Sequence, residues 1–165
     1  MPGFAIIWRR PRRGKIEGVR YLTPYRIAAY LLVFFCAGHT AGGMLSEKRL
    51  GPGADAVFSA MKSVHFDFNG ATVTWYGFWF AFGLMVSVFL LFSAVVAWRL
   101  DSVEPKSWSM VSIIAWALVA SHACNAILSW VYFFAGAGFL ATAIAMLLAA
   151  GAFRKERAAA SRGTS

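Results

Sequence analysis

The sequence predicts an all-α integral membrane protein, built as a four-helix bundle with a short amphipathic interfacial helix in its outer loop. Hydrophobic residues make up 59% of the 165 residues and charged residues only 14%, far from the composition of soluble domains. Three long runs lack Asp, Glu, Lys and Arg entirely: residues 27–46, 68–98 and 107–153. Because a helix needs about 20 apolar residues to cross a bilayer, these runs predict transmembrane helices.

The three runs divide into four spans, of about residues 24–45, 72–98, 107–129 and 132–153. The second span is long enough to tilt in the bilayer. The last charge-free run is too long for one span, so we expect it to fold back on itself. We expect the turn between Ser129 and Ala135, because Trp130 and Tyr132 suit a membrane interface and glycines nearby loosen the backbone.

Basic residues predict the orientation of the spans, because Lys and Arg near span ends stay on the cytoplasmic side. They concentrate in residues 1–23, in the loop after the second span and in residues 154–165. The outer loop holds only Lys48, Arg49 and Lys62. Both termini are therefore expected in the cytoplasm as basic segments, with the first span as an uncleaved anchor. The net charge of +9 then faces anionic headgroups, so membrane lipids are the expected partners and nucleic acid is not.

The outer loop has the pattern of an amphipathic helix over about residues 53–66. Ala54, Val57, Phe58 and Met61 recur at steps of three and four, which is typical of a helix with one apolar face. Such a helix lies on a membrane surface and acts as a lid over the bundle. It either shields the ends of the spans or closes a binding site, bringing His65 and Asp67 over it. The following Asn-Gly pair is a turn signal.

Two histidines within apolar sequence, His39 and His122, indicate where a site lies. Each is the sixteenth residue of its expected span, roughly 22 Å from the cytoplasmic side. Trp75 and Tyr76 descend to much the same level from the outer side. Because polar groups in hydrocarbon usually face a bundle interior or a cavity, we expect a polar and aromatic pocket in the outer leaflet. The predicted ligand-binding residues are His39, Thr40, His65, Asp67, Trp75, Tyr76, His122 and Asn125.

Three interpretations of this pocket stay open. In the first, His39, Thr40, His122 and Asn125 hydrogen-bond one another and only hold helices together. In the second, aromatic walls enclose a lipid, a quinone or another apolar molecule, and the histidines anchor its polar head. An enzyme of isomerase or oxidoreductase type, with His39 and His122 as catalytic candidates, is a variant of this second interpretation.

In the third interpretation, His39 and His122 are the axial ligands of a b-type haem. A zinc site would need further ligands from His65 or Asp67, and no metal site other than the haem alternative is expected. The absence of charged residues inside the spans argues against an ion-coupled pump.

Glycines predict the closest helix contacts. Gly38 and Gly42 lie four residues apart in the first span, a spacing that lets helices approach closely in lipid. Gly77 and Gly83 are expected to mark similar contacts of the second span.

Several short motifs resemble a group of small bacterial four-helix membrane proteins, and the wider arrangement is similar to DoxX-like proteins. The resemblance covers about residues 24 to 150 and implies a four-helix protein of the bacterial inner membrane. Some DoxX-like proteins are membrane subunits of quinone-linked oxidoreductases, so the resemblance favours an accessory subunit, partnered by other membrane proteins or by copies of itself, or a quinone-type ligand. It transfers no catalytic residue. The motifs are Gly38-His39-Thr40, Met61, Gly70, Trp75-Tyr76-Gly77-Phe78 and Gly83.

Overall fold

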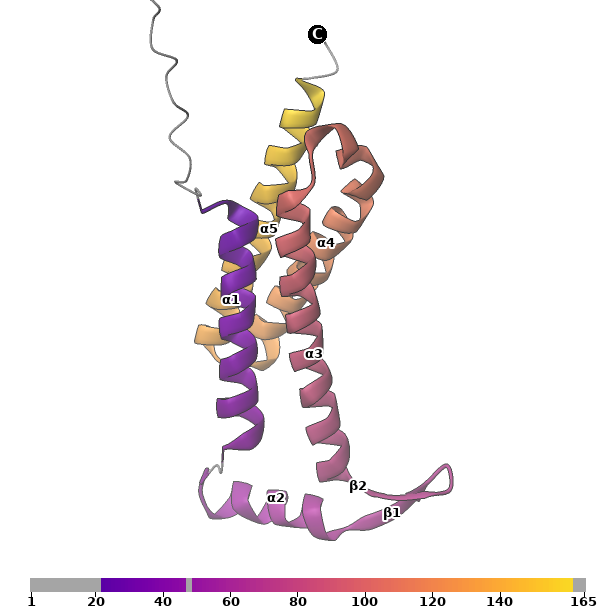
Figure 1. The fold of residues 1–165 in the computed structure, drawn as a ribbon. Helices are drawn as coiled ribbons and strands as arrows, with labels where there is room; N and C mark the ends of the chain where they lie inside the picture. Colours follow the sequence, from indigo (N-terminus) through magenta and orange to yellow (C-terminus); the bar gives the residue numbers. More distant parts are fainter. Residues whose placement is uncertain (1–21, 47–48, 162–165) are drawn as a thin grey trace, which may run out of the picture.

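The computed structural model describes residues 22–46 and 49–161, and it shows an all-α fold with four long helices (Figure 1). Each of the four is long and apolar enough to cross a membrane, which confirms the predicted fold class and identifies an integral membrane protein. Most of the predicted basic segment 1–23 and the last residues of the tail 154–165 lie outside the described residues. We call the end where α1 begins and α5 ends the terminal end, and the opposite end the α2 end.

The first span combines an α-helix and a π-helix. Helix α1 covers Pro24–Gly38, and a π-helical segment, η1, continues it over His39–Leu45. Thr23 caps the start, because its side chain accepts a hydrogen bond from the backbone N–H of Arg26 and so satisfies one of the free donors of the first turn. Pro24 suits the first helical position, where no N–H is needed. The span therefore has the predicted extent.

The loop at the α2 end contains a helix and a β-hairpin. Helix α2 covers Pro52–Ser63, β1 His65–Phe68 and β2 Ala71–Thr74. The two strands are antiparallel, with His65 opposite Thr74. The amphipathic helix is thus present, but it ends three residues before the predicted limit at residue 66. The hairpin had not been predicted.

The hairpin turn shows why the helix ends early. Asn69 and Gly70 both have positive φ, 53° and 84°, the conformation that a two-residue hairpin turn requires and that Asn-Gly favours. Asp67 stabilises the turn by accepting a hydrogen bond from the N–H of Gly70 at 2.9 Å. Because β2 uses residues 71–74, the second span begins at Trp75 rather than at residue 72, with the side chain of Thr74 as its cap.

Helices α3 and α5 are longer than predicted at the terminal end, and α4 is longer than predicted at the opposite end. Helix α3 covers Trp75–Ser102, a short 3-10 turn, η2, covers Pro105–Ser107, and α4 and α5 cover Trp108–Tyr132 and Ala135–Ala160. The turn between α4 and α5 falls at residues 133–134, inside the predicted region. Helices α3 and α5 pass the predicted limits at residues 98 and 153. In α5 the added residues are Arg, Lys, Glu and Ala, and in α3 they begin with Arg99 and Leu100; these residue types have high helix propensity and continue a helix beyond the apolar core.

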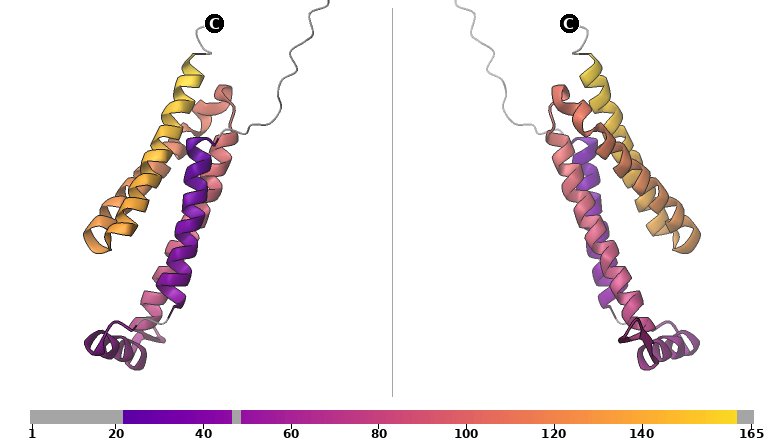
Figure 2. Two further views of the ribbon diagram at one scale, coloured as in Figure 1. Left: turned by 90° about the vertical axis from the view of Figure 1, so that its left-hand side faces the viewer. Right: turned by 90° about the vertical axis from the view of Figure 1, so that its right-hand side faces the viewer.

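The spans form two pairs, α1 with α3 and α4 with α5, and α5 also packs against α1. The pairs lie close together at the terminal end and diverge toward the α2 end (Figure 2). The core between them consists largely of small and aliphatic side chains, such as Ala28, Leu32, Ala97, Ile144 and Leu148.

Glycines mark close contacts, though at other positions than predicted in the first span. A Cβ at Gly38 or Gly42 would meet no heavy atom within 4 Å, so the prediction that this pair marks a helix contact is wrong within the chain. Gly83 does mark one, because a Cβ there would overlap the sulfur of Met44. At Gly151 on α5, a Cβ would lie 2.8 Å from the ring of Tyr25 on α1.

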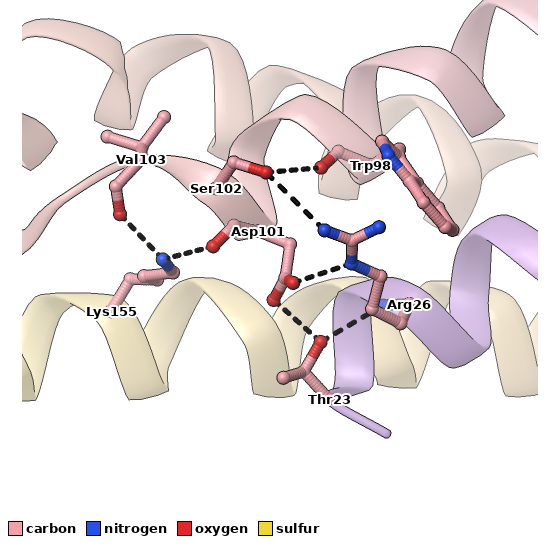
Figure 3. Close-up of polar contacts among 7 residues, drawn as sticks. All are labelled: Thr23, Arg26, Trp98, Asp101, Ser102, Val103 and Lys155. Atoms are coloured by element: carbon pink, nitrogen blue, oxygen red, sulfur yellow. Dashed lines mark hydrogen bonds and ion pairs between the residues drawn. The ribbon is translucent and has the colours of Figure 1, made fainter. Parts of the chain in front are cut away.

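A polar cluster joins three spans at the terminal end (Figure 3). Arg26 on α1 donates from Nε to Oδ2 of Asp101 on α3 at 2.7 Å, and the hydroxyl of Thr23 donates to Oδ1 at 2.6 Å. Lys155 on α5 donates from Nζ to the carbonyl oxygens of Asp101 and Val103, both at 2.6 Å. These carbonyls lie at the C-terminus of α3, where helical carbonyls lack internal partners. We call Thr23, Arg26, Asp101 and Lys155 the terminal cluster.

Candidate functional site

The predicted residues His39 and Thr40 form a polar seam between α1 and α3. His39 donates from Nε2 to the carbonyl oxygen of Gly83 at 3.0 Å. The hydroxyls of Thr40 and Ser87 lie 2.7 Å apart, and the thiol of Cys36 lies 3.4 Å from the carbonyl oxygen of Ser87. We call Cys36, His39, Thr40, Gly83 and Ser87 the α1–α3 seam. Its geometry is that of helix-to-helix hydrogen bonding in an apolar surrounding.

The π-helical turn is part of the reason why these groups meet. It begins at His39, and π-helical turns are uncommon and shift the phase of the side chains that follow. The next bulky side chain of the turn, Met44, lies over Gly83, where a larger residue on α3 would collide with it. The absence of a side chain at Gly83 therefore lets α1 and η1 approach α3 at this level.

His122 lies elsewhere, against a different part of α3. It is 1% exposed, and its ring stacks on that of Phe89 with 5.1 Å between the centroids. Its Nε2 has no hydrogen-bond partner among the described residues. The contacts of His39 and His122 on α3, at Gly83 and Phe89, are six residues apart, or about 9 Å along the helix. His39 and His122 were expected at the same depth, but they contact α3 at different levels.

Three polar residues of α4, spaced at i, i+3 and i+7, are turned away from the surface of the protein. His122 and Ser129 are buried, and Asn125 is half-buried between them. In the described part of the chain, however, the side-chain hydrogen bonds of His39 and Thr40 go to α1 or α3 rather than to α4. The first interpretation expected these residues to bond His122 and Asn125, whereas His39 and Thr40 join two helices through partners on the second span.

The two histidines do not fit the haem alternative in this arrangement. A bis-histidine haem takes one nitrogen from each of two imidazoles that face each other across the macrocycle. His39 uses Nε2 to bind a carbonyl oxygen, and Nδ1 faces Gly43 of its own turn. The ring of His122 is covered by Phe89. Within residues 22–46 and 49–161, no group of three or more His, Cys, Asp or Glu residues could hold a metal ion.

The predicted lid residues His65 and Asp67 are exposed on the hairpin. His65 Nδ1 lies 2.9 Å from the carbonyl oxygen of Ser63, and Asp67 stabilises the Asn-Gly turn. The predicted aromatic residue Trp75 packs on Phe66 with 4.8 Å between ring centroids. These residues therefore shape the hairpin and are not brought to the α1–α3 seam.

A pocket of about 370 Å³ lies between α2, the end of η1 and the first turns of α3. Of the predicted ligand-binding residues, Tyr76 lines it. The side chains of Phe58 and Trp79 meet edge to face within its wall, with 5.5 Å between the ring centroids. Three charged side chains also line it. We call this cavity the α2 pocket; its lining includes Phe58, Tyr76 and Trp79 with Arg49, Asp55 and Lys62.

Sequence reasoning missed the charged residues of the α2 pocket, although a signal was present. Asp55, Phe58, Ser59 and Lys62 have the spacing i, i+3, i+4 and i+7, which places them on one helix face. The prediction of an amphipathic helix considered only its apolar residues, which lie on a neighbouring face. Because Phe58 belongs to both groups and contacts α3 through Trp79, the charged residues beside it also face the pocket.

No family model matches the chain, and neither does any curated protein or any solved structure.

Proposed function

We propose that the protein binds a hydrophobic molecule with a polar head, of lipid or quinone type, in the α2 pocket at the outer surface of a bacterial inner membrane. The observation that carries the proposal is the α2 pocket itself, with aromatic walls and charged residues where a surface helix meets two spans. Its volume of about 370 Å³ is within the usual range of small-molecule sites.

The distribution of charge supports the orientation. The terminal end carries Arg26, Arg99, Lys106, Arg154, Lys155 and Arg157 among the described residues, whereas the α2 end carries Arg49 and Lys62. Since basic residues are retained in the cytoplasm, both termini are cytoplasmic in this proposal and the α2 pocket faces outward. Tyr76 and Trp79 then lie at the outer interface, where aromatic residues are enriched.

The pocket supports binding better than catalysis. Of the two catalytic candidates, His39 is hydrogen-bonded to the carbonyl oxygen of Gly83, and His122 is buried and stacked on Phe89. Neither of them lines the α2 pocket. The pocket residues offer charge and aromatic surface, and none of the described residues that line it is a histidine.

The test is to identify what co-purifies with the protein. Wild-type protein and the variants Phe58→Ala and Phe82→Ala are purified in mild detergent, and their lipids and quinones are measured by mass spectrometry. Phe58 lines the pocket, whereas Phe82 is 61% exposed on α3 outside it. We expect Phe58→Ala alone to lose a specific co-purified molecule. Equal lipid and quinone content in the three folded proteins would contradict the proposal.

An accessory subunit is the second candidate function, and the resemblance to DoxX-like proteins favours it. Large apolar side chains such as Phe34, Phe92, Met110 and Phe139 are exposed on the spans, and a partner's spans could cover some of them in place of lipid. Cross-linking in intact membranes followed by purification tests this role. Recovery of the chain as a lone monomer would contradict it.

A further inference from the structure

We propose that the α2 pocket selects an anionic phospholipid, whose phosphate is bound by Arg49 and Lys62. This inference rests on the proposed function and names the class of ligand that the same pocket takes.

The two cations of the pocket are not neutralised within the described part of the chain. Neither Arg49 nor Lys62 forms an ion pair with a described acidic side chain, since the ion pairs there are Arg26 with Asp101 and Lys106 with Glu104. The ammonium of Lys62 instead lies over the ring of Tyr76, 4.8 Å from its centroid. This contact holds the ammonium at the pocket wall and leaves its N–H donors available for an anion.

Asp55, the acidic residue among the described residues that line the pocket, is hydrogen-bonded to the backbone just before its own helix. Asp55 lies in the first turn of α2, and its Oδ1 accepts a hydrogen bond from the backbone N–H of Leu50 at 3.2 Å. A carboxylate is favourable at this end of a helix, so its position has a structural reason. Among the described lining residues, Arg49 and Lys62 against Asp55 leave one surplus positive charge, which matches a headgroup with one negative charge.

The position of the pocket indicates a lipid as the source of the phosphate. Tyr76 and Trp79 belong to the first turns of a spanning helix, at the level where lipid headgroups meet the hydrocarbon core. Met44 and Leu45 line the same pocket, and Leu45 is 66% exposed. A lipid could therefore place its phosphate among the cations while its acyl chains stay in the bilayer beside these apolar side chains.

The chemistry of Arg and Lys agrees with a phosphate. An arginine guanidinium forms paired, charge-assisted hydrogen bonds with phosphate oxygens, and a lysine ammonium adds a point charge. A neutral quinone head would leave the surplus positive charge of the pocket without a counter-ion. Of the two ligand types in the proposed function, the charges of the pocket thus favour a lipid with a phosphate over a quinone.

The test compares lipids that differ only in the headgroup. Purified full-length protein is titrated with phosphatidylglycerol, phosphatidylethanolamine and phosphatidylcholine of equal chain length, and the bound lipids are counted by native mass spectrometry. We expect phosphatidylglycerol to bind at least about tenfold more tightly than phosphatidylcholine, since each basic residue near the surface attracts anionic lipid. The double variant Arg49→Gln/Lys62→Gln should remove this preference.

The matched control is Arg99→Gln/Lys106→Gln, which removes the same charge from exposed positions at the terminal end and should keep the preference. Asp55→Asn distinguishes the headgroups further. If a phosphate alone is recognised, this variant binds phosphatidylglycerol as tightly as before or more tightly. If Asp55 pairs with the ammonium of phosphatidylethanolamine, that lipid binds best and Asp55→Asn weakens it, which would overturn the inference.

The remaining outcomes separate this inference from the proposed function. Equal binding of all three lipids, still lost in Phe58→Ala, would overturn the anionic preference and keep the pocket as a lipid site. Binding that none of the pocket variants changes would overturn both. Inorganic phosphate should displace phosphatidylglycerol only weakly, because it lacks acyl chains; displacement at equal concentration would identify free phosphate as the ligand and contradict the inference.

Discussion

The guanidinium of Arg26 and the carboxylate of Asp101 form an ion pair of 2.7 Å, although 75 residues separate them in the chain. Their side chains are 22% and 13% exposed, so the pair is largely shielded from water. The hydroxyl of Thr23 binds the second carboxylate oxygen, and the guanidinium also lies over the ring of Trp98, 3.5 Å from its centroid. The first two spans are thus held together at one end by a compact polar contact.

We expect Asp101→Ala to lower the free energy of unfolding by about 1–3 kcal/mol, because it leaves the guanidinium of Arg26 and the hydroxyl of Thr23 without their partner. Unfolding in a mixed detergent series, followed by circular dichroism, measures the change. Glu104→Ala is the matched control. Its partner is Lys106, and both side chains are more than half exposed, so a change within about 0.5 kcal/mol is expected. Equal effects of the two variants would contradict a stabilising role of the terminal cluster.

Gly151→Ala should destabilise the contact between α1 and α5. The added Cβ would lie 2.8 Å from a carbon atom of the Tyr25 ring, and the ring is buried and cannot turn away freely. Overpacking of this kind costs about 1–3 kcal/mol. Thermal unfolding in detergent can detect it.

Gly38→Ala serves as the control for that experiment, since its Cβ would meet no heavy atom within 4 Å. Alanine has the higher helix propensity, by about 0.8–1 kcal/mol, so this variant should be as stable as the wild type or more stable. A marked loss of stability in Gly38→Ala would indicate that another chain covers this face.

His39→Ala should weaken the bundle without changing the occupancy of the α2 pocket. The variant loses the hydrogen bond to the carbonyl oxygen of Gly83, and hydrogen bonds between spans are worth about 0.6 kcal/mol on average and 1.7 at most. Unfolding in detergent measures the stability, and mass spectrometry measures the co-purified lipid. If the folded variant loses its ligand, His39 belongs to the binding site and the proposed boundary of the pocket is wrong.

His122→Phe should keep the bundle as stable as the wild type or stabilise it by about 1–2 kcal/mol. A phenyl ring can stack on Phe89 as the imidazole does, and it removes a buried nitrogen that has no partner among the described residues and whose burial is unfavourable. The same unfolding assay applies. A large loss of stability, or loss of an activity found later, would show that the imidazole nitrogen has a role beyond packing.

Much of the fold was predictable because charge and hydropathy mark membrane spans directly. The turn between α4 and α5 and the start of α1 at Pro24 agree with the predictions. The ends of α3 and α5 were less accurate, because hydropathy marks the edge of the apolar core and not the last helical residue. The hairpin was not predicted, although Asn69-Gly70 is a turn signal, because the predicted helix extended to residue 66 and so included the first residues of β1.

The site was harder to predict than the fold. Depth along a span can be counted from the sequence, but the direction of a side chain around the helix depends on how the helices pack against one another. His39 therefore faces the second span instead of His122. Arg49 and Lys62 were not predicted as site residues because basic residues in an outer loop ordinarily face water, and only their position beside Phe58 and Tyr76 places them at a pocket.

The bonds of Lys155 to the last carbonyls of α3 also constrain the biogenesis of the protein. A ribosome completes α1 and α3 long before it reaches Lys155, so the ion pair of Arg26 and Asp101 can form while the final span is still being synthesised. Until α5 has inserted, the two carbonyls of Asp101 and Val103 depend on water at the membrane surface. The chain therefore reaches its final structure only when the last helix has been made and Lys155 binds the carbonyl oxygens at the C-terminus of α3.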